Sequence, residues 1–383
     1  MQHIIIITTS YPFANDGSEA AGSFVADFAK VLSQYLQVTV IAPSLNSNSK
    51  KPNPNLTIKY FKVPRLPLSL LKPHKDLPAI LTTLNAGKKA LKQVVLENNS
   101  IEHIFALWAL PSGYWAETIG KNYNIPYSTW ALGSDIWNLG KIPLVKNVLK
   151  KVLKNSHTNF ADGYLLKQSV ESISERTCHF LPSTRSLNIA KPKQLSVQPP
   201  YRLAFLGRWH FNKGIDLLLE SLNQLSDWES IEEIRICGGG PLESTVKSAY
   251  TVLKKSYPIT LQGYLNKTEA IKLLLWADYI LIPSRIESIP VIFSDAMKCQ
   301  CPVVSMPVGD LSRLITKYEV GILAKEVSAT AFAQAINHIL TKSPSSFSSK
   351  IELAANDFNI KYIVKQFIEQ LQLVPSVVNS TNY

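Results

Sequence analysis

Two carboxylates flank an apolar turn in "PSRIESIPVIFSDAMKCQCPVV", residues 283–304. Glu287 follows an apolar run with the look of a strand, and Asp295 comes eight residues later, inside an expected helix. An ionised carboxylate accepts charge-assisted hydrogen bonds from the hydroxyl groups of a ribose or another sugar. A loop acid and an unrelated, exposed helix acid would give the same pattern, so neighbouring loops must decide between these alternatives.

Two cations occur in a second stretch, "GRWHFNKG", residues 207–214, directly before the helix-like "IDLLLESL". Arg208 and Lys213 would lie near the N-terminus of that helix, where backbone N–H groups and the helix dipole favour an anion. Two fixed cations at such a place suit a diphosphate, with solvated loop charges as the alternative. Cations for a diphosphate and carboxylates for hydroxyl groups together form the set that holds a nucleotide sugar.

A glycine-rich turn lies between these two stretches. The run "CGGGPLES" contains Gly238, Gly239 and Gly240, followed by Pro241. Glycine permits close backbone approach and a sharp turn, and proline suits a first helical turn. Such turns also serve packing alone, so this one supports a ligand site only together with the other two stretches.

The elements that would position these loops alternate between short apolar runs and segments with helical spacing. This alternation predicts an α/β protein with doubly wound parallel sheets, in which ligands bind at the carboxyl ends of the strands. The expected strands are 3–9, 38–43, 57–63, 103–108, 127–132 and 158–162 in the first half, and 202–207, 233–238, 259–264, 279–284, 302–307 and 321–324 in the second.

The chain length of 383 residues favours two domains. A polar segment with four prolines, at about 181–200, has no period and is expected to link them. We therefore predict domains at 1–198 and 199–350 that face a central cleft. The remaining residues, 351–383, are expected to form a helical segment that returns to the N-terminal domain.

The net charge of +12 is concentrated in the first half of the chain. Residues 1–198 hold 22 Lys and Arg against 11 Asp and Glu, a net of +11, whereas residues 199–383 hold 18 against 17, a net of +1. This asymmetry predicts an anionic partner for the first half: a membrane surface, a phosphorylated substrate or nucleic acid. Nucleic acid is disfavoured because aromatic residues are not interleaved with the basic ones as stacking platforms.

Segment 141–155, "KIPLVKNVLKKVLKN", contributes the densest positive charge. Its apolar residues recur at helical spacing, and other faces carry Lys146, Lys150, Lys151 and Lys154. We expect either a core-facing helix with a solvated basic face or a helix that lies on an anionic membrane. No apolar run approaches the roughly 20 residues of a membrane span, and no signal peptide is recognised, which predicts a cytoplasmic protein with optional peripheral attachment to the membrane.

The four cysteines are Cys178, Cys237, Cys299 and Cys301. None belongs to a CxxC pair, and Cys299 and Cys301 are too close in sequence for an ordinary disulfide or a zinc knuckle. We expect reduced cysteines that serve packing.

The second half resembles the donor-binding domain of retaining family 4 glycosyltransferases of the GT-B fold (glycosyl transferases group 1). The motifs that carry the resemblance occur in the family's order: Gly207-Arg208 with Lys213-Gly214, then Gly238-Gly239-Gly240-Pro241, then Pro283-Ser284 with Glu287 and Asp295, then Pro302-Val303-Val304 with Gly309-Asp310. The first half is similar less tightly, through "AGSFVADFAKVL" (21–32), "LWALPSGYWA" (107–116) and "WALGSDIW" (130–137).

The resemblance implies a metal-independent hexosyltransferase that moves a sugar from a UDP- or GDP-linked donor to a glycan or lipid-linked acceptor, in cell-surface polysaccharide or glycolipid synthesis. It implies no cofactor and no metal ligand, in keeping with the lack of an Asp-x-Asp motif. It assigns catalysis to Arg208, Lys213 and Glu287, and donor binding to Gly22, Gly207, Gly240, Ser288, Ile289, Pro290 and Asp295. Asp135 is a candidate acceptor contact, with a helix N-cap as the plainer alternative.

The chain departs from the family pattern at three places: at Asp295, in the acceptor-side stretch, and after the last strand of the first half, where "LPSTRS" stands instead of the usual Asn-Gly. Asp295 is the second acid of the motif and is expected to bind the ribose. The family usually has Glu at this position, which is one methylene longer. The acceptor-side stretch "STWALGSD" contains no histidine, and the nearby His103 is expected to be a packed strand residue. A catalytically impaired nucleotide-sugar-binding protein, or a GT-B relative such as a nucleotide-sugar epimerase, therefore remains an alternative.

Overall fold

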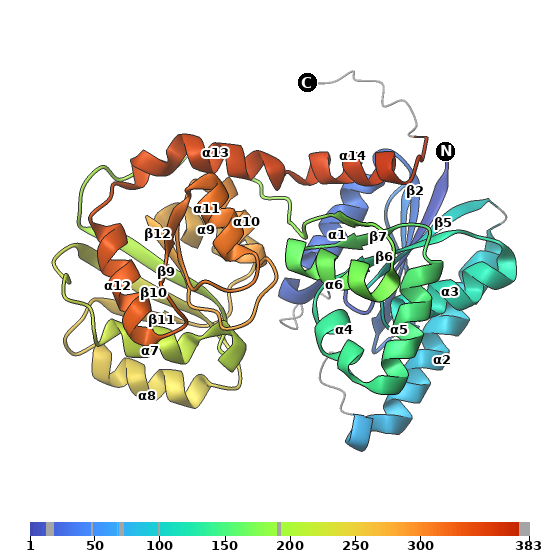
Figure 1. Cartoon of the computed structure of the whole chain (residues 1–383), viewed down its shortest axis with the longest axis horizontal. Helices are drawn as coiled ribbons and strands as arrows, with labels where there is room; N and C mark the ends of the chain where they lie inside the picture. Colours follow the sequence, from blue (N-terminus) through green and yellow to red (C-terminus); the bar gives the residue numbers. More distant parts are fainter. Residues whose placement is uncertain are drawn as a thin grey trace. The chain divides into compact units, whose positions relative to one another are not determined.

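The computed structural model describes residues 1–12, 19–46, 49–66, 68, 73–98, 100–189 and 193–374. The chain forms two compact units, both drawn in Figure 1: unit 1 is Met1–Ser183 with Ile360–Tyr383, and unit 2 is Thr184–Asn359. The first unit thus ends at Ser183, earlier than the predicted boundary at 198, and the predicted segment 351–383 is divided between the units. The described residues of 184–200 contain no helix or strand, as expected for a linker, but they pack with unit 2.

Unit 1 is built on one mostly parallel sheet in the order β3-β4-β2-β1-β5-β6-β7-β8, where only the β3–β4 pair is antiparallel. Its strands are β1 (His3–Ile7), β2 (Gln37–Ser44), β3 (Ser49–Asn53), β4 (Leu56–Lys62), β5 (Ile101–Leu107), β6 (Tyr127–Ala131), β7 (Asn159–Ala161) and β8 (Cys178–Phe180). All six strands predicted for this half are present. The sequence did not reveal β3, which is polar and exposed, or β8, which has only three residues.

Helices cover both faces of this sheet, and the central strands β1 and β6 are accordingly buried at every position. In β1, Ile4 and Ile6 pack with α1 (Glu19–Leu32) and α14 (Ile360–Gln370), whereas Ile5 and Ile7 face the opposite core. That second core includes residues from α2 (Pro73–Glu97), α3 (Ser112–Tyr123), α5 (Pro143–Asn155) and α6 (Tyr164–Ser174). The short α4 (Ser134–Trp137) and the 3-10 turn η2 (Leu139–Lys141) precede α5.

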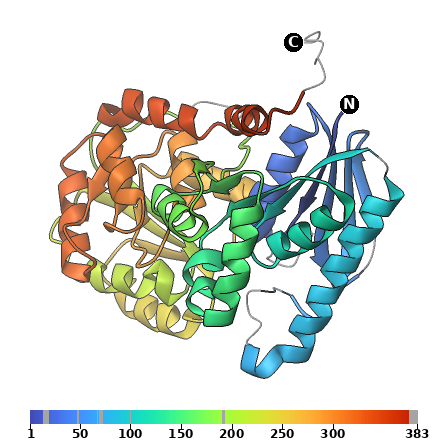
Figure 2. The same ribbon diagram turned by 45° about the vertical axis from the view of Figure 1, so that its right-hand side comes forward.

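Helix α14 brings the end of the chain back to unit 1. It lies beside α1 in both ribbon views, although the two helices come from opposite ends of the chain (Figures 1 and 2). The ring of Phe367 lies 4.4 Å from that of Phe105, 5.3 Å from that of Phe28 and 5.4 Å from that of Phe160, measured between centroids. Residues from Ile360 onwards therefore complete a core that the first 183 residues leave open.

Unit 2 contains a fully parallel sheet in the order β11-β10-β9-β12-β13-β14. Its strands, all predicted from the sequence, are β9 (Tyr201–Arg208), β10 (Ile231–Gly239), β11 (Ile259–Gln262), β12 (Tyr279–Ile282), β13 (Val303–Ser305) and β14 (Gly321–Leu323). The helices are α7 (Ile215–Leu222), α8 (Glu243–Leu253), α9 (Lys267–Trp276), α10 (Val291–Lys298), α11 (Leu311–Tyr318), α12 (Ala329–Leu340) and α13 (Ser348–Asp357), with 3-10 turns η3 (Phe211–Lys213) and η4 (Pro344–Phe347).

The strand order of unit 2 contains a topological switch. The chain runs outwards from β9 to β10 and β11, then crosses to the other side of β9 to form β12, β13 and β14. At such a switch the loops that follow the two central strands turn away in opposite directions and leave room for a ligand at the carboxyl edge. The loops after β9 and β12 are therefore the place where unit 2 should bind a small molecule.

All four cysteines are buried and free, which confirms that they serve packing. Among the described residues, no helix combines the length and the apolar character that crossing a membrane requires.

Candidate functional site

Three of the predicted site residues lie around the switch point of unit 2. Arg208 is the last residue of β9, Lys213 ends the turn η3 in the loop that follows, and Glu287 belongs to the loop after β12. Because β9 and β12 are neighbours in a parallel sheet, these loops meet at one edge. The structure thus confirms the prediction that these two loops converge at one edge of the sheet.

Gly214 allows the two loops to approach so closely. Its φ of 65° is left-handed, and a Cβ at this position would lie 1.8 Å from the carbonyl oxygen of Pro283. Any side chain there would separate the loop after β9 from the loop after β12. The backbone N–H of Arg285 then donates to the carbonyl oxygen of Asn212 at 2.8 Å and ties the loops together.

The side chain of Arg285 reinforces this junction. Its Nη1 and Nη2 donate to the two carboxylate oxygens of Asp216, each at 2.7 Å, and its guanidinium lies 4.0 Å from the centre of the Phe211 ring. The Arg285 partner also lowers the pKa of Asp216, against the opposing effect of burial. A bidentate pair of this kind fixes both partners, so the loop that carries Lys213 has a defined position.

Lys213 and Glu287 contact each other directly. The Nζ of Lys213 donates to Oε1 of Glu287, which also accepts from the Ser284 hydroxyl at 3.3 Å. The Lys213 side chain is 34% exposed and the Glu287 side chain 13% exposed, so a ligand can reach the pair from solvent. Lysine and glutamate are therefore adjacent at the switch point, where an anionic group and a hydroxyl group of one ligand could each find a partner.

Arg208 adds an uncommitted positive charge beside this pair. It is exposed, and within the described part of the chain its side chain makes no hydrogen bond or ion pair. The adjacent Gly207 ends the apolar part of β9, and Gly240 lies in the turn after β10 against the backbone of Trp209. The N–H of Leu242 donates to the carbonyl oxygen of Trp209 at 3.0 Å, which joins that turn to the Arg208 loop.

Ser288, Ile289 and Pro290 form the buried backbone that leads into α10. Pro290 is the N-cap, and no side chain caps the free N–H groups of the first helical turn. Gly309 holds the loop after β13 against this segment: a Cβ there would lie 2.0 Å from the carbonyl oxygen of Glu287. The start of α10 is thus a donor-rich helix N-terminus, which attracts an anion.

Asp295 differs from the sequence expectation in its surroundings. It lies in the second turn of α10, fully buried, and both Nε and Nη2 of Arg185 donate to its Oδ2. Its Oδ1 has no hydrogen-bond partner among the described residues. The predicted contact of Asp295 with a ribose stays a prediction, but its carboxylate is already engaged by an arginine that the sequence did not point to.

Two predicted residues, Gly22 and Asp135, belong to unit 1. Gly22 is in α1 and allows that helix to pack on the backbone of Tyr11, because a Cβ would lie 2.6 Å from the Tyr11 Cα. Asp135 is buried in α4, where Gly133 is the N-cap, so the N-cap alternative is wrong. Its carboxylate accepts instead from the N–H groups of Ala109, at 2.6 Å, and Leu132, at 3.2 Å.

The environment of Asp135 raises its pKa to about 6, because burial disfavours the charged form more than the backbone N–H groups favour it. The donors come from the loops after β5 and β6, so Asp135 holds two loops at the carboxyl edge of the sheet. Its predicted acceptor contact is untested. His103, expected to be packed, is buried in β5, bonded to the Ser128 hydroxyl at 2.9 Å, and burial lowers its pKa to about 3.

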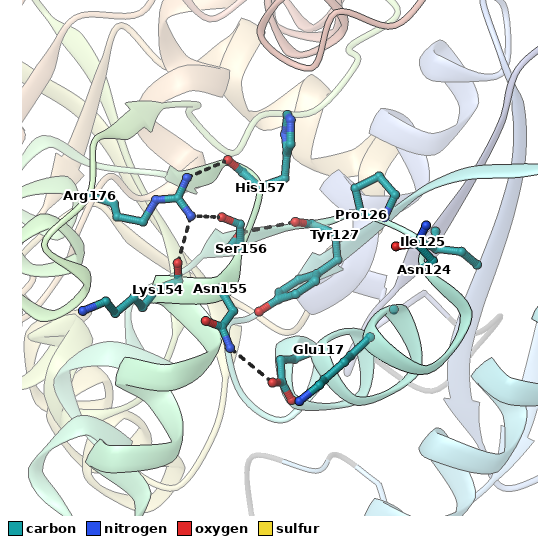
Figure 3. A pocket seen from close by; sticks show the side chains of 12 residues that line it. Glu117, Asn124, Ile125, Pro126, Tyr127, Lys154, Asn155, Ser156, His157 and Arg176 are labelled. Atoms are coloured by element: carbon teal, nitrogen blue, oxygen red, sulfur yellow. Dashed lines mark hydrogen bonds between the residues drawn. The ribbon is translucent and has the colours of Figure 1, made fainter.

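Unit 1 also has an open depression of about 810 Å3 at the opposite edge of its sheet, between the ends of α3 and α5 and the start of β6. Figure 3 shows Arg176 directed at the backbone there; its guanidinium donates to the carbonyl oxygens of Lys154, Ser156 and His157. Glu117 accepts from Asn155 and pairs with Lys151. The charges of Arg176 and Glu117 are thus satisfied within the protein, and they do not point to a ligand in the depression.

Comparison with known proteins gives a family for most of unit 2. Residues 188–355 match the family described as Glycosyl transferases group 1. A Bacillus subtilis (strain 168) glycosyltransferase named for teichuronic acid biosynthesis, TuaC, is 27% identical over 248 residues, which are 61% of this chain and 60% of that protein. The match therefore covers less than two thirds of that relative.

Solved structures resemble nearly the whole chain. Sucrose-phosphate synthase from Thermosynechococcus elongatus superposes with a TM-score of 0.74 at 15% identity, covering 97% of this chain and 98% of that one. The Anabaena protein HepE, in complex with UDP and glucose, gives a TM-score of 0.69 at 14% identity, covering 97% and 100%. At these identities the likeness shows the fold: two Rossmann-like α/β units of the GT-B type.

Proposed function

We propose that this chain, whose residues 188–355 match the family Glycosyl transferases group 1, transfers a sugar from a nucleoside diphosphate sugar to a glycan or lipid-linked acceptor. One observation carries the proposal: Arg208, Lys213 and Glu287 meet at the switch point of unit 2, beside the uncapped start of α10. An α/β sheet binds its ligand there, and these groups match the two ends of such a donor.

The diphosphate of the donor would lie between the two cations and the start of α10. When the glycosidic bond breaks, negative charge develops on the leaving diphosphate, and preorganised positive groups stabilise it. Arg208 is free to bind it, and Lys213 would turn from Glu287 towards the phosphate. We propose that these groups supply the charge stabilisation without a metal ion.

Glu287 would bind the hydroxyl groups of the transferred sugar. Its carboxylate is held by Lys213 and Ser284, so its position is fixed before the donor arrives. An ionised carboxylate in a partly buried position accepts strong hydrogen bonds from hydroxyl groups. Retention of the anomeric configuration is proposed from the likeness of the ordered motifs to retaining enzymes of family 4.

The acceptor is proposed to be a polysaccharide or glycolipid precursor at a membrane surface. The support is the N-terminal half of α5, where Ile142, Leu144 and Val148 are 41%, 81% and 39% exposed. Lys141 and Lys146 lie in the same stretch, and neither has an ion pair within the described residues. Exposed apolar side chains flanked by lysines suit the headgroup region of an anionic bilayer.

The structure changes which lysines would serve this contact. Lys150 and Lys154 pair with Glu175, and Lys151 pairs with Glu117. Three of the four lysines predicted from the sequence are thus partly neutralised within unit 1. The proposed contact is therefore the start of α5, with Leu144 as its most exposed apolar side chain.

The test of the transfer activity is incubation of the protein with UDP- and GDP-linked sugars, with and without EDTA, followed by analysis of released nucleotide and sugar. Slow donor hydrolysis that is unaffected by EDTA and first releases the anomer of the donor is the expected result. Binding without turnover would instead support a nucleotide-sugar-binding protein, and release of an epimer would support an epimerase. Absence of both binding and turnover would overturn the proposal.

A further inference from the structure

The segment that enters unit 2 is fixed along α10. The Thr184 hydroxyl donates to the carbonyl oxygen of Phe358 at 3.0 Å, and its oxygen also lies 3.3 Å from the Ser294 hydroxyl oxygen. The Nζ of Lys298 donates to the carbonyl oxygen of Arg185 at 2.6 Å. The backbone at Arg185 is therefore held against the helix that begins at the proposed donor site.

The side chain of Arg185 is held equally firmly, but its hydrogen bonding is incomplete. Nε donates to Oδ2 of Asp295 at 2.8 Å, and Nη2 donates to the same oxygen. Within the described residues, Nη1 of Arg185 and Oδ1 of Asp295 have no hydrogen-bond partner. The Asp295 side chain is fully buried and the Arg185 side chain is 13% exposed, so of the two side chains only that of Arg185 reaches solvent.

The pair lies close to the proposed donor site. Asp295 follows Val291, the first residue of α10, by one helical turn, or about 6 Å along the axis. Side chains on a helix lean towards its N-terminus, so the Asp295 carboxylate and the bound guanidinium lie over the first turn of α10. Ser288 and Pro290, which lead into that turn, continue directly to Glu287.

A carboxylate in this state is poorly placed to receive a ribose. Both of its hydrogen bonds come from Arg185 to one oxygen, and its other oxygen is closed off from solvent. Of the pair, only the Arg185 side chain reaches solvent, and its guanidinium donates hydrogen bonds and never accepts them. A hydroxyl oxygen of the ligand can accept from it.

We infer that Arg185 is a specificity-determining residue of the donor site, whose free guanidinium edge donates to the hydroxyl oxygens of the donor's ribose. Asp295 is the positioning residue that holds Arg185, and it replaces the direct ribose contact expected from the sequence. This inference rests on the proposed function. It identifies the ligand as a ribonucleoside diphosphate. It also adds a contact to this ligand from Arg185, in the segment that precedes β9.

The test measures binding of UDP and GDP, and of their 2′,3′-dideoxy analogues, to the full chain by calorimetry. Wild-type protein should prefer the ribonucleotide to its dideoxy analogue by about tenfold or more, because hydrogen bonds to a charged group are stronger than neutral ones. Arg185→Gln should weaken ribonucleotide binding by a similar factor and leave binding of the dideoxy analogue unchanged. Asp295→Asn should reduce the preference without removing it.

Arg202→Gln is the matched control, because Arg202 also pairs with a fully buried carboxylate, Asp278, but at the amino end of β9. It should leave the preference intact whatever it does to stability. If Arg185→Gln does not fold, Arg185→Lys serves, since lysine keeps the charge but cannot hold Asp295 and still present a planar donor edge.

If Arg185→Gln weakened binding of the ribonucleotide and of its dideoxy analogue equally, or changed neither, the inference would be overturned while the proposed function stayed in place. Failure of the wild-type protein to bind any of these nucleotides would overturn the proposed function, and the role of Arg185 with it.

Discussion

At the scale of single residues, the buried carboxyl of Asp135 makes a prediction about pH. Its pKa in the folded protein is about 6, above the ordinary aspartate value of 3.8, so the folded state holds a proton between these values that the unfolded chain has lost. The stability of unit 1 should therefore fall as pH rises from about 4 to 6, by roughly 3 kcal/mol from this group.

Asp135→Asn removes that dependence and keeps one oxygen acceptor. Relative to wild type, the variant should gain stability between pH 4 and pH 7, measured by urea unfolding at both values. If the difference in unfolding free energy between wild type and Asp135→Asn were the same at both pH values, Asp135 would not be the titrating group.

The cations at the switch point make a prediction about turnover. Arg208→Ala and Lys213→Ala should each lower kcat for donor turnover by about 100-fold or more, because each removes a preorganised positive charge from the leaving group. Lys255→Ala, at an exposed lysine after α8, is the matched control and should leave kcat unchanged. Near-normal turnover in both site variants would contradict the assigned roles.

The site residues that sequence reasoning recovered are those whose position follows from chain order. Lys213 and Glu287 meet because each follows the end of a strand, and the strands are neighbours. Arg185 could not be found this way, because its partner is 110 residues away and its own segment has no period. The burial of Asp295 depends on which face of α10 packs inwards, and Arg185 itself helps to cover that face.

At the scale of elements, the loop after β13 supports the loop that carries Glu287. Gly309 has a φ of 53°, and a Cβ there would lie 2.0 Å from the Glu287 carbonyl oxygen. Gly309→Ala should therefore displace the Glu287 loop and raise the donor KM by about tenfold, since a left-handed alanine is also strained by about 1 kcal/mol. Gly263→Ala is the control, because nothing lies within 4 Å of its Cβ position. Equal donor KM values for Gly309→Ala and Gly263→Ala would contradict the prediction that Gly309 supports the Glu287 loop.

The start of α5 makes a prediction about membrane attachment. Wild-type protein should sediment with vesicles that contain anionic lipid and dissociate as salt rises, because screening shortens the reach of its lysines to about 10 Å at 0.1 M salt. Leu144→Ser should reduce sedimentation several-fold, whereas Lys150→Gln with Lys151→Gln should have little effect. Failure of the wild-type protein to sediment at low salt would refute the attachment.

The elements themselves were largely predictable. Predicted strands such as β1, β6 and β12 are buried at every position, and burial on both faces favours the apolar runs by which strands are recognised. The strand β3, "SKKPN", has no such run because it pairs at the antiparallel edge of the sheet, where its side chains face solvent. The three residues of β8 are too few to show a period.

At the scale of the whole molecule, the boundary between the units could not be read from composition. The proline-rich segment suggested a break near 198, but Thr184 and Arg185 already bond to α10, so unit 2 begins before most of the prolines. A linker recognised by its lack of period can still be packed, because hydrogen bonds to distant residues leave no local pattern. The return of the chain end to unit 1 likewise depends on one apolar face of α14.

That apolar face makes the last prediction. Phe367 is fully buried against Phe28, Phe105 and Phe160, all from the first 183 residues of the chain. Phe367→Ala should destabilise unit 1 by about 3–5 kcal/mol, the usual cost of a cavity left by a buried aromatic ring. Amide exchange measured by mass spectrometry should then increase across β1, β5 and α1 and stay unchanged in β9 to β13. Tyr362→Ala, at a half-exposed position of the same helix, should leave both units unchanged. Faster exchange spread equally over both units would show that α14 does not belong to unit 1 alone.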